Sequence, residues 1–331
     1  MSLLPRSRTI LRAGVLSLLA LAPLAGCRKE SGGGGAGGEA KEGKFTVGFS
    51  QMGHDNPWRM AQTASLRAEA AKRGYELVVT DAQDQTAKQV ADVEDLIARR
   101  VGIILLAPRE FEGLAPALQA AKDANIPVIL VDREAEGVPG EDFVTFLGSN
   151  FVEQGRRAAE WLVKETGGTA GIVELTGTPG SSVATDRARG FREVIARHPG
   201  MKILASQTGE FSRANGQRVM QNVAQSLGAQ ITAVYAHNDE MALGAIQALR
   251  ASGRTPGTDV KIVSIDGQRA ALEAIQRGEL GATVESNPRF GPIAFETIEQ
   301  VRKGEQVPTK KLITDRFFDR TNAAQFVADA Y

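Results

Sequence analysis

The sequence predicts an α/β protein of two similar lobes, each built on a doubly wound parallel sheet. Strand-like and helix-like segments alternate along most of the 331 residues, as in sheets covered by helices on both faces. Several strand segments are continuously apolar, which is typical of buried parallel strands. An apolar strand that ends in aspartate occurs once in each half, at Asp132 and Asp266. The length also suits two domains.

The first half begins with a strand rich in phenylalanine and valine. Asn56 and Pro57 then suit the cap and the first turn of a helix. Thr86 and Gln89 have the spacing of a capping box, which predicts that the next helix starts there. The expected strands of this half are 45–52, 75–80, 102–107, 126–131 and 143–147, and a third helix is expected at 113–124.

The second half repeats the alternation, and a tail follows it. Its expected helices are 152–164, 183–197, 214–227 and 240–251, and its expected strands are 171–175, 202–206, 233–236 and 260–265. The tail over 282–331 is expected to hold a strand, a helix at about 290–302 and a strand at 311–318. Ligands of such sheets bind beyond the carboxyl ends of the strands, so two facing sheets predict a cleft.

The N-terminus has the features of an export signal. Arginines precede an apolar run over residues 14–24, which is too short for a membrane-spanning helix. Residues 24–27 read LAGC and resemble a bacterial lipobox, in which the cysteine is diacylated and becomes the first residue. Cys27 is the only cysteine, so no intramolecular disulfide can form. The alternative is a stray thiol in a plain signal peptide.

A glycine-rich stretch follows Cys27. It cannot bury enough apolar surface to order itself, so we expect a signal peptide over 1–26 and a lipidated cysteine with a flexible tether over 27–44. Its glycines lack the preceding strand and following helix that a nucleotide loop requires. The 39 basic and 39 acidic residues balance, so no overall field points to nucleic acid.

Catalytic and metal-binding motifs are missing from the sequence. It contains no GxSxG, HExxH or Walker A pattern and no GxGxxG between a strand and a helix. His54, His198 and His237 do not have metal-ligand spacing, and Asp81 and Asp84 suit a polar loop better than a calcium loop. We therefore expect a non-enzymatic protein with no cofactor and no metal.

Several short segments of the folded part share one order and spacing with a known family. They read NPWR at 56–59, IPV at 126–128, DR at 132–133, DRARGF at 186–191, GEFSR at 209–213, HNDEMALGA at 237–245 and SIDG at 264–267. Together they resemble the periplasmic sugar-binding proteins of the ribose-binding family over nearly all of 45–331. Trp58-Arg59 and the run YAHND at 235–239 are similar to its galactofuranose-binding members.

This resemblance implies a periplasmic binding protein of type I, with two lobes joined by a three-crossing hinge. The implied lobes are 45–149 with 285–314, and 150–284 with 315–331. The implied function is capture of a monosaccharide, a galactofuranose-like hexose or a pentose, and delivery to the permease and ATPase of an ABC importer. A lipid anchor would hold the protein at the membrane, and no nucleic acid is involved.

The resemblance also implies the ligand-binding residues. Aromatic rings cover the C–H faces of a sugar, while carboxylates, guanidinium groups and amides bond its hydroxyls. The implied set is Trp58 and Phe211 for stacking, with Arg59, Asp132, Arg133, Arg187, Asn238 and Asp266 for hydroxyls. The sequence leaves other roles open, such as a core aromatic for Trp58, a helix cap for Asn238 and a turn residue for Asp266.

The chain departs from the ribose binders at two places. They carry two aromatics where this chain has Trp58-Arg59, and a glutamine near the last cleft strand. The departures indicate a more polar pocket than that of a ribose binder. The sequence does not decide whether Glu285, Ser286 or Asn287 faces the ligand.

Three other functions compete. Sugar-responsive repressors share this core but need a helix-turn-helix before it, where this chain has the signal and tether. A sensory lipoprotein that signals to a membrane receptor would use the same cleft, and the sequence does not separate it from an importer subunit. A cleft enzyme would need a nucleophile with a base, which no motif provides.

Overall fold

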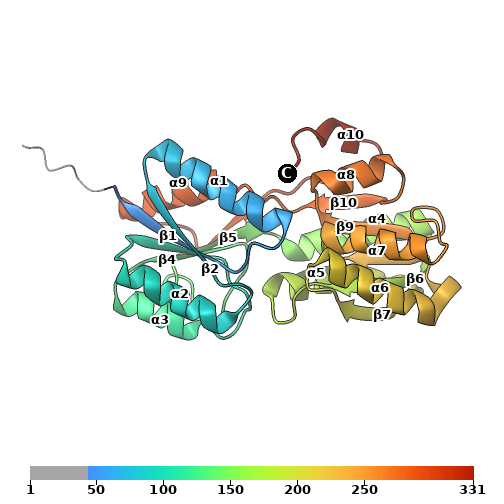
Figure 1. Cartoon of the computed structure of the whole chain (residues 1–331), viewed down its shortest axis with the longest axis horizontal. Coiled ribbons are helices and arrows are strands. Elements are labelled where there is room, and N and C mark those ends of the chain that lie inside the picture. Colours follow the sequence, from blue (N-terminus) through green and yellow to red (C-terminus); the bar gives the residue numbers. More distant parts are fainter. Residues whose placement is uncertain (1–43) are drawn as a thin grey trace, which may run out of the picture. The chain divides into compact units, whose positions relative to one another are not determined.

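Two six-stranded sheets with flanking helices make up residues 44–331, the part of the chain that the computed structural model describes (Figure 1). The predicted fold class of two α/β lobes is confirmed. The predicted signal peptide, the lipidation site at Cys27 and all of the tether except its last residue lie outside the described residues. Within residues 44–331, no helix has the length and apolar character needed to cross a membrane.

The first sheet is entirely parallel, in the order β11-β5-β4-β3-β1-β2. Its strands are β1 (Thr46–Gln51), β2 (Glu76–Asp81), β3 (Ile103–Leu106), β4 (Val128–Val131), β5 (Thr145–Ser149) and β11 (Lys310–Ile313), and its helices are α1 (Pro57–Arg73), α2 (Thr86–Ala98), α3 (Ala115–Asp123) and α9 (Gly291–Arg302). Helices α1 and α9 cover one face and α2 and α3 the other. The continuous apolar strands therefore bury both faces.

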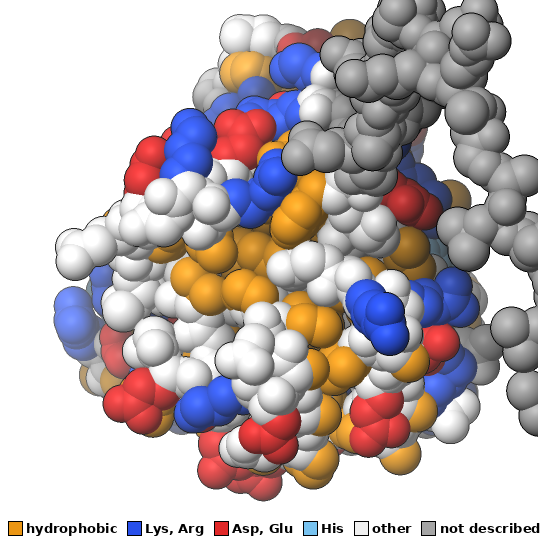
Figure 2. Space-filling view, turned by 90° about the vertical axis from the view of Figure 1, so that its left-hand side faces the viewer, with side chains coloured by type: hydrophobic (Ala, Val, Ile, Leu, Met, Phe, Trp, Pro, Cys, Tyr) orange, Lys and Arg blue, Asp and Glu red, His pale blue; other side chains and the backbone are white. Residues whose placement is uncertain are grey.

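The end of the first lobe that Figure 2 shows has hydrophobic side chains near its centre and charged side chains around them. The predicted site residues of this lobe, Trp58, Arg59, Asp132 and Arg133, lie elsewhere, in a pocket that residues of the second lobe also line.

The second sheet has the order β12-β10-β9-β8-β6-β7, and only β12 is antiparallel to its neighbour. Its strands are β6 (Thr169–Thr176), β7 (Gly200–Thr208), β8 (Ala233–Ala236), β9 (Lys261–Asp266), β10 (Ala282–Glu285) and β12 (Phe317–Asp319), and its helices are α4 (Phe151–Thr166), α5 (Ser182–Ile195), α6 (Arg213–Leu227), α7 (Asp239–Ala251), α8 (Arg269–Gln276) and α10 (Ala323–Phe326). Helices α4 and α5 pack on one face, and α6, α7 and α8 on the other.

The chain passes between the two sheets at three places. It leaves the first sheet after β5, returns between β10 and β11, and leaves again between β11 and β12. These connecting segments are the three crossings expected for the hinge of the molecule. The residue limits expected for the lobes, 45–149 with 285–314 and 150–284 with 315–331, stay a prediction.

Two local predictions are wrong. The single strand expected at 311–318 is two strands, because β11 pairs with β5 while β12 pairs with β10 in the other sheet. The capping box at Thr86 and Gln89 does not form. Gln85 takes the cap position, and the buried Gln89 side chain donates to the Ala107 carbonyl and accepts from an amide of the next loop.

Glycines let helices α4 and α5 approach closely. A Cβ at Gly155 would lie 2.1 Å from the Arg187 carbonyl oxygen, and a Cβ at Gly190 would lie 1.9 Å from that of Val152. Only glycine fits at such distances. This contact sets the position of α5, which carries Arg187 toward the interior of the molecule.

Candidate functional site

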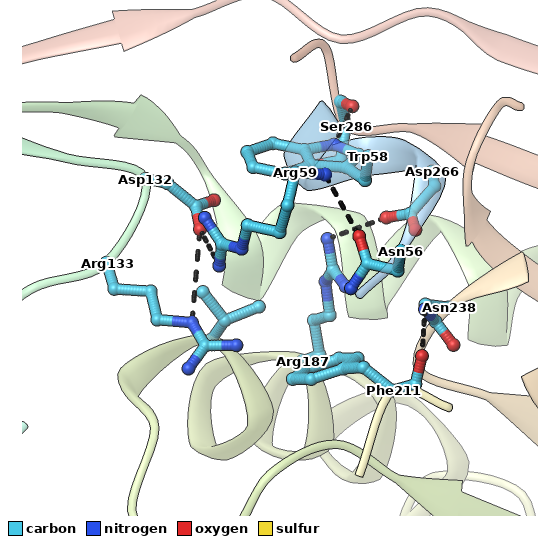
Figure 3. A pocket seen from close by; sticks show the side chains of 11 residues that line it. Asn56, Trp58, Arg59, Asp132, Arg133, Arg187, Phe211, Asn238, Asp266 and Ser286 are labelled. Carbon is cyan, nitrogen blue, oxygen red and sulfur yellow. Dashed lines mark hydrogen bonds and ion pairs between the residues drawn. The ribbon is translucent and has the colours of Figure 1, made fainter. Parts of the chain in front are cut away.

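A pocket between the two lobes brings together all the residues that the sequence predicted as ligand-binding (Figure 3). It contains about 340 Å³ of space. Its lining residues are Asn56, Trp58, Arg59, Asp132, Arg133, Val183, Arg187, Phe211, Asn238, Asp266 and Ser286. That these side chains share one pocket is a structural observation, while their role in binding stays a prediction.

The start of helix α1 positions the first-lobe aromatic. The Asn56 side chain accepts a hydrogen bond from the Arg59 amide at 2.9 Å, which confirms the predicted cap. Trp58 donates from Nε1 to the Ser286 carbonyl at 2.7 Å and packs edge-to-face on Phe290 at 6.0 Å. Trp58 is therefore a core residue and a pocket residue at once.

The two aspartates lie at the carboxyl ends of buried strands. Asp132 follows β4 directly, and Asp266 is the last residue of β9. Both have a positive φ, 68° for Asp132 and 137° for Asp266. Such backbone angles are uncommon for non-glycine residues and concentrate at functional sites. They turn both carboxylates into the same pocket (Figure 3).

Three guanidinium groups face these two carboxylates. Arg59 Nη2 lies 2.6 Å from Asp132 Oδ2, and Arg187 Nη2 lies 3.5 Å from Asp266 Oδ1. Burial raises the pKa of the Asp266 carboxyl well above its usual range, although the charge of Arg187 opposes the shift. Three guanidinium groups thus face two carboxylates, and amide and backbone oxygens accept from them as well.

Arg133 is the least satisfied of these groups. It is 3% exposed, and burial lowers its pKa to about 9, with the nearby charge of Arg59 adding to the effect. Its Nη1 donates to the Arg109 carbonyl at 2.5 Å. Its Nε has no hydrogen-bond partner among the described residues, because Asp132 Oδ2 is 3.9 Å away. An acceptor oxygen of a ligand would remove this deficit.

The second lobe holds Phe211 and Asn238 firmly. The Phe211 ring lies against Gly177, where a Cβ would come within 1.9 Å of it, and the guanidinium groups of Arg133 and Arg187 lie 5.4 and 5.9 Å from the ring centroid. Asn238 caps helix α7 and donates from Nδ2 to the Phe211 carbonyl at 3.1 Å. One N–H and one lone pair of its amide stay free for a ligand.

Of the three residues that the sequence left open after β10, one lines the pocket. Ser286 lines the pocket, whereas the Glu285 carboxylate accepts hydrogen bonds from Arg316 at 2.6 and 2.9 Å. Asn287 accepts from a neighbouring backbone amide. Sequence reasoning missed Asn56 and Val183 as lining residues. The sequence predicts Asn56 only as a cap, although its place in the NPWR motif is a usable signal.

The pocket offers hydrogen-bond groups and aromatic faces and no metal-binding cluster. No group of three or more His, Cys, Asp or Glu side chains suited to a metal occurs among residues 44–331. His237 is fully buried beside the pocket, where its Nδ1 accepts from the Gly177 amide at 3.4 Å and its Nε2 lies 3.3 Å from Glu174. Charged donors, charged acceptors and two aromatic rings around one small space suit a polyhydroxylated ligand.

Comparison with known proteins agrees with this architecture. The profile of the periplasmic binding protein domain matches residues 47–306. The galactofuranose-binding protein YtfQ of Escherichia coli is 40% identical over 273 residues, which is 82% of this chain and 86% of YtfQ. The ribose import binding protein RbsB of Escherichia coli is 38% identical over 81% of this chain and 88% of RbsB.

A solved structure extends the likeness to the folded body. The periplasmic binding component of the arabinose ABC transporter from Shewanella sp. ANA-3, bound to α- and β-L-arabinofuranose, superposes with a TM-score of 0.83. It is 41% identical, and the superposition covers 86% of this chain and 95% of that protein.

Proposed function

Because the chain belongs to the periplasmic binding protein family, we propose that it captures a monosaccharide in the pocket between its lobes and delivers it to an ABC importer. The observation that carries the proposal is the convergence of three arginines, two aspartates and two aromatic rings on about 340 Å³. Relatives at 40% and 38% identity are named for galactofuranose and ribose binding. Both are binding proteins rather than enzymes by name.

The polarity of the pocket favours a sugar. Its three arginines and two aspartates offer charged donors and acceptors for hydroxyls, and its two aromatic rings offer apolar faces. The proposed ligand is a galactofuranose-like hexose or a pentose. Asp132 and Arg133 from one lobe and Arg187, Asn238 and Asp266 from the other would bond the same ring.

Contacts from both lobes imply that the ligand closes the protein. A sugar that bridges Arg133 and Asp266 binds the closed form better than the open form, so it shifts the population toward closure. Small-angle scattering with and without the cognate sugar tests this step. We expect compaction at saturation, and an unchanged radius would contradict closure.

The proposed location is extracytoplasmic, with Cys27 as a lipid anchor. The support is the signal-like N-terminus and the LAGC run at 24–27. Mass spectrometry of the exported protein should find an acylated N-terminal cysteine. A mature N-terminus elsewhere, with Cys27 unmodified or removed, would overturn the anchor.

Thermal-shift screening tests the binding function directly. The panel consists of D-galactose, L-arabinose, D-ribose, D-fructose and D-glucose, each at millimolar concentration. A sugar that binds only the folded protein raises its melting temperature by mass action. We expect a concentration-dependent rise with one or two of these sugars and none with the others. A flat response to every sugar contradicts the proposal.

A further inference from the structure

The three segments that connect the lobes meet at one carboxylate. Asp315, in the last segment, accepts at 3.0 Å from Oγ of Ser149, the last residue of β5 before the first segment. The same oxygen accepts from the Asn287 amide in the second segment at 3.4 Å. Ser149 ends one strand of the first sheet and Asp315 follows another, whereas Asn287 follows a strand of the second, so a change in the angle between the lobes acts on the contact between Asn287 and Asp315. The Asp315 carboxylate therefore bonds residues at the other two connections between the lobes.

A buried amide connects this carboxylate to the pocket. Gln154, on helix α4, is 1% exposed. Its Nε2 donates to Asp315 Oδ2 at 2.7 Å, and its Oε1 accepts from Arg187 Nε at 2.9 Å. A guanidinium can only donate and a carboxylate can only accept, so both partners fix the amide in one orientation. Nε2 also lies 3.3 Å from the carbonyl of Glu285, the last residue of β10 before the second connecting segment.

Arg187 is the pocket residue that this amide restrains. Its Nη1 donates to the His237 carbonyl at 2.6 Å, and its Nη2 lies 3.5 Å from Asp266. Gln154 occupies the remaining Nε position, on the side of the guanidinium that faces the hinge. Removing Gln154 would leave Arg187 with fewer fixed partners in the pocket, although Gln154 itself does not line it.

We propose that Gln154 is a positioning residue that couples Arg187 in the pocket to Asp315 in the hinge, so that ligand binding and lobe closure depend on one amide. The coupling rests on the proposed function, since it assumes that Arg187 contacts the sugar. In the closed form the Gln154 side-chain amide aligns Arg187 and also donates to the Asp315 carboxylate. Ligand affinity should then depend on a residue that does not touch the ligand.

The charges around Asp315 make this coupling sensitive to pH. Arg157 on α4 donates to the Asp315 carbonyl at 2.9 Å, Glu285 and Arg316 form an ion pair beside it, and Arg187 lies beyond the amide. Burial raises the pKa of the Asp315 carboxyl to about 6, against the hydrogen bonds from Gln154 and Ser149. A second carboxyl placed at position 154 would share a proton with Asp315, because adjacent carboxylates resist double ionisation.

The test compares Gln154→Glu with Gln154→Ala. At pH 8 both should bind the cognate sugar, with L-arabinose and D-galactose as probes, about tenfold or more weakly than the parent. From pH 8 to pH 5 Gln154→Glu should regain most of this loss, because a shared proton restores the bond to Asp315. Gln154→Ala should not recover. Gln119→Glu is the matched control, since Gln119 Nε2 also donates to an aspartate, Asp123, at 2.7 Å but on the surface.

A measurement without ligand separates this proposal from the proposed function. Trp58 bonds the carbonyl of Ser286 in the second connecting segment, so its fluorescence reports on the hinge in a Trp161→Phe background. In the ligand-free parent and in Gln119→Glu the fluorescence should follow Asp315 near its pKa of about 6, whereas in Gln154→Glu the transition should lie at higher pH, because the second carboxyl shares the proton. If no sugar binds the parent, the proposed function fails and this transition still tests the coupling. Parent-like affinity of Gln154→Glu at pH 8, or a transition no higher in pH than that of the parent, overturns the proposal.

Discussion

The guanidinium of Arg59 lies 2.6 Å from the carboxylate of Asp132, and the two side chains are 5% and 7% exposed. Both residues belong to the first lobe, so the pair can form before any ligand arrives. A second donor, Arg59 Nη1, bonds Gln62 Oε1 at 3.1 Å. The Asp132 carboxylate is thus fixed toward the pocket by a partner from helix α1.

Removing one member of this pair should destabilise the ligand-free protein. Arg59→Ala or Asp132→Ala leaves a buried charge without its main partner, which costs about 3–5 kcal/mol. Urea denaturation of both single variants and the double variant gives the coupling energy. The exposed pair Arg99 and Asp95 is the control, with an expected coupling of about 0.3–0.5 kcal/mol. Equal couplings for the two pairs would show that the Arg59–Asp132 pair has no special role.

Acid should weaken the second lobe through Glu174 and His237, which are both fully buried. Burial would raise the pKa of Glu174, but hydrogen bonds with His237, Ser206 and Arg192 together outweigh it and lower the pKa to about 2. Burial lowers the pKa of His237 below its ordinary 6.5. Both groups bind protons more tightly when unfolded, so the free energy of unfolding should fall as the pH falls below 6.5 and again between 4.5 and 2.

Glu174→Gln isolates the second of these two steps. It should be less stable than the parent at pH 7 and should lose less stability between pH 4.5 and pH 3. Urea midpoints at pH 7, 5 and 3.5 measure the effect. Glu141→Gln, at an exposed position, serves as the control and should follow the parent. A Glu174→Gln curve parallel to the parent curve would contradict the role of this carboxylate.

Contacts across the cleft should set the lifetime of the closed form. The Glu134 amide donates to Ser182 Oγ at 3.0 Å, and the Phe111 amide donates to the Gly180 carbonyl at 2.9 Å. These bonds join residues of different lobes, so they require closure. Ser182→Ala should weaken sugar affinity about two- to tenfold, mainly through faster dissociation.

Stopped-flow kinetics measure that change. Ser226→Ala is the control, because Ser226 Oγ bonds only the Asn222 carbonyl within its own helix. An unchanged dissociation rate in Ser182→Ala would show that this contact does not hold the lobes together.

Local patterns predicted much of the fold, and the resemblance to the ribose-binding family implied most of the residues that line the pocket. The cap at Asn56 and the strands that end at Asp132 and Asp266 are signals within a few residues, and the structure brings them into one pocket. Long-range pairing is different. Gln154 and Asp315 are 161 positions apart, and no local pattern marks their bond. The single strand predicted at 311–318 is wrong for the same reason. Its two parts, β11 and β12, pair with strands of different sheets, and those partners are distant in the sequence.

The last prediction concerns the balance between stability and binding at Arg133. Its pKa is lowered, and its Nε has no partner among the described residues. Both observations indicate that interactions with neighbouring groups do not fully compensate the loss of hydration of this guanidinium. Arg133→Met keeps most of the side-chain volume and removes the buried charge. The ligand-free variant should therefore be as stable as the parent or more stable, as is common where a site residue is kept for function.

Sugar binding should change in the opposite direction. Arg133→Met and Asp266→Ala each remove a charged hydrogen-bond partner of the ligand, worth about 1.5–3 kcal/mol, so affinity should fall about tenfold to a few hundredfold. Trp58→Ala should weaken binding through lost stacking. Glu305→Ala, at an exposed position, should bind as the parent does. Calorimetry with the cognate sugar on folded variants measures these affinities, and parent-like binding by both Arg133→Met and Asp266→Ala would show that the sugar does not occupy this pocket.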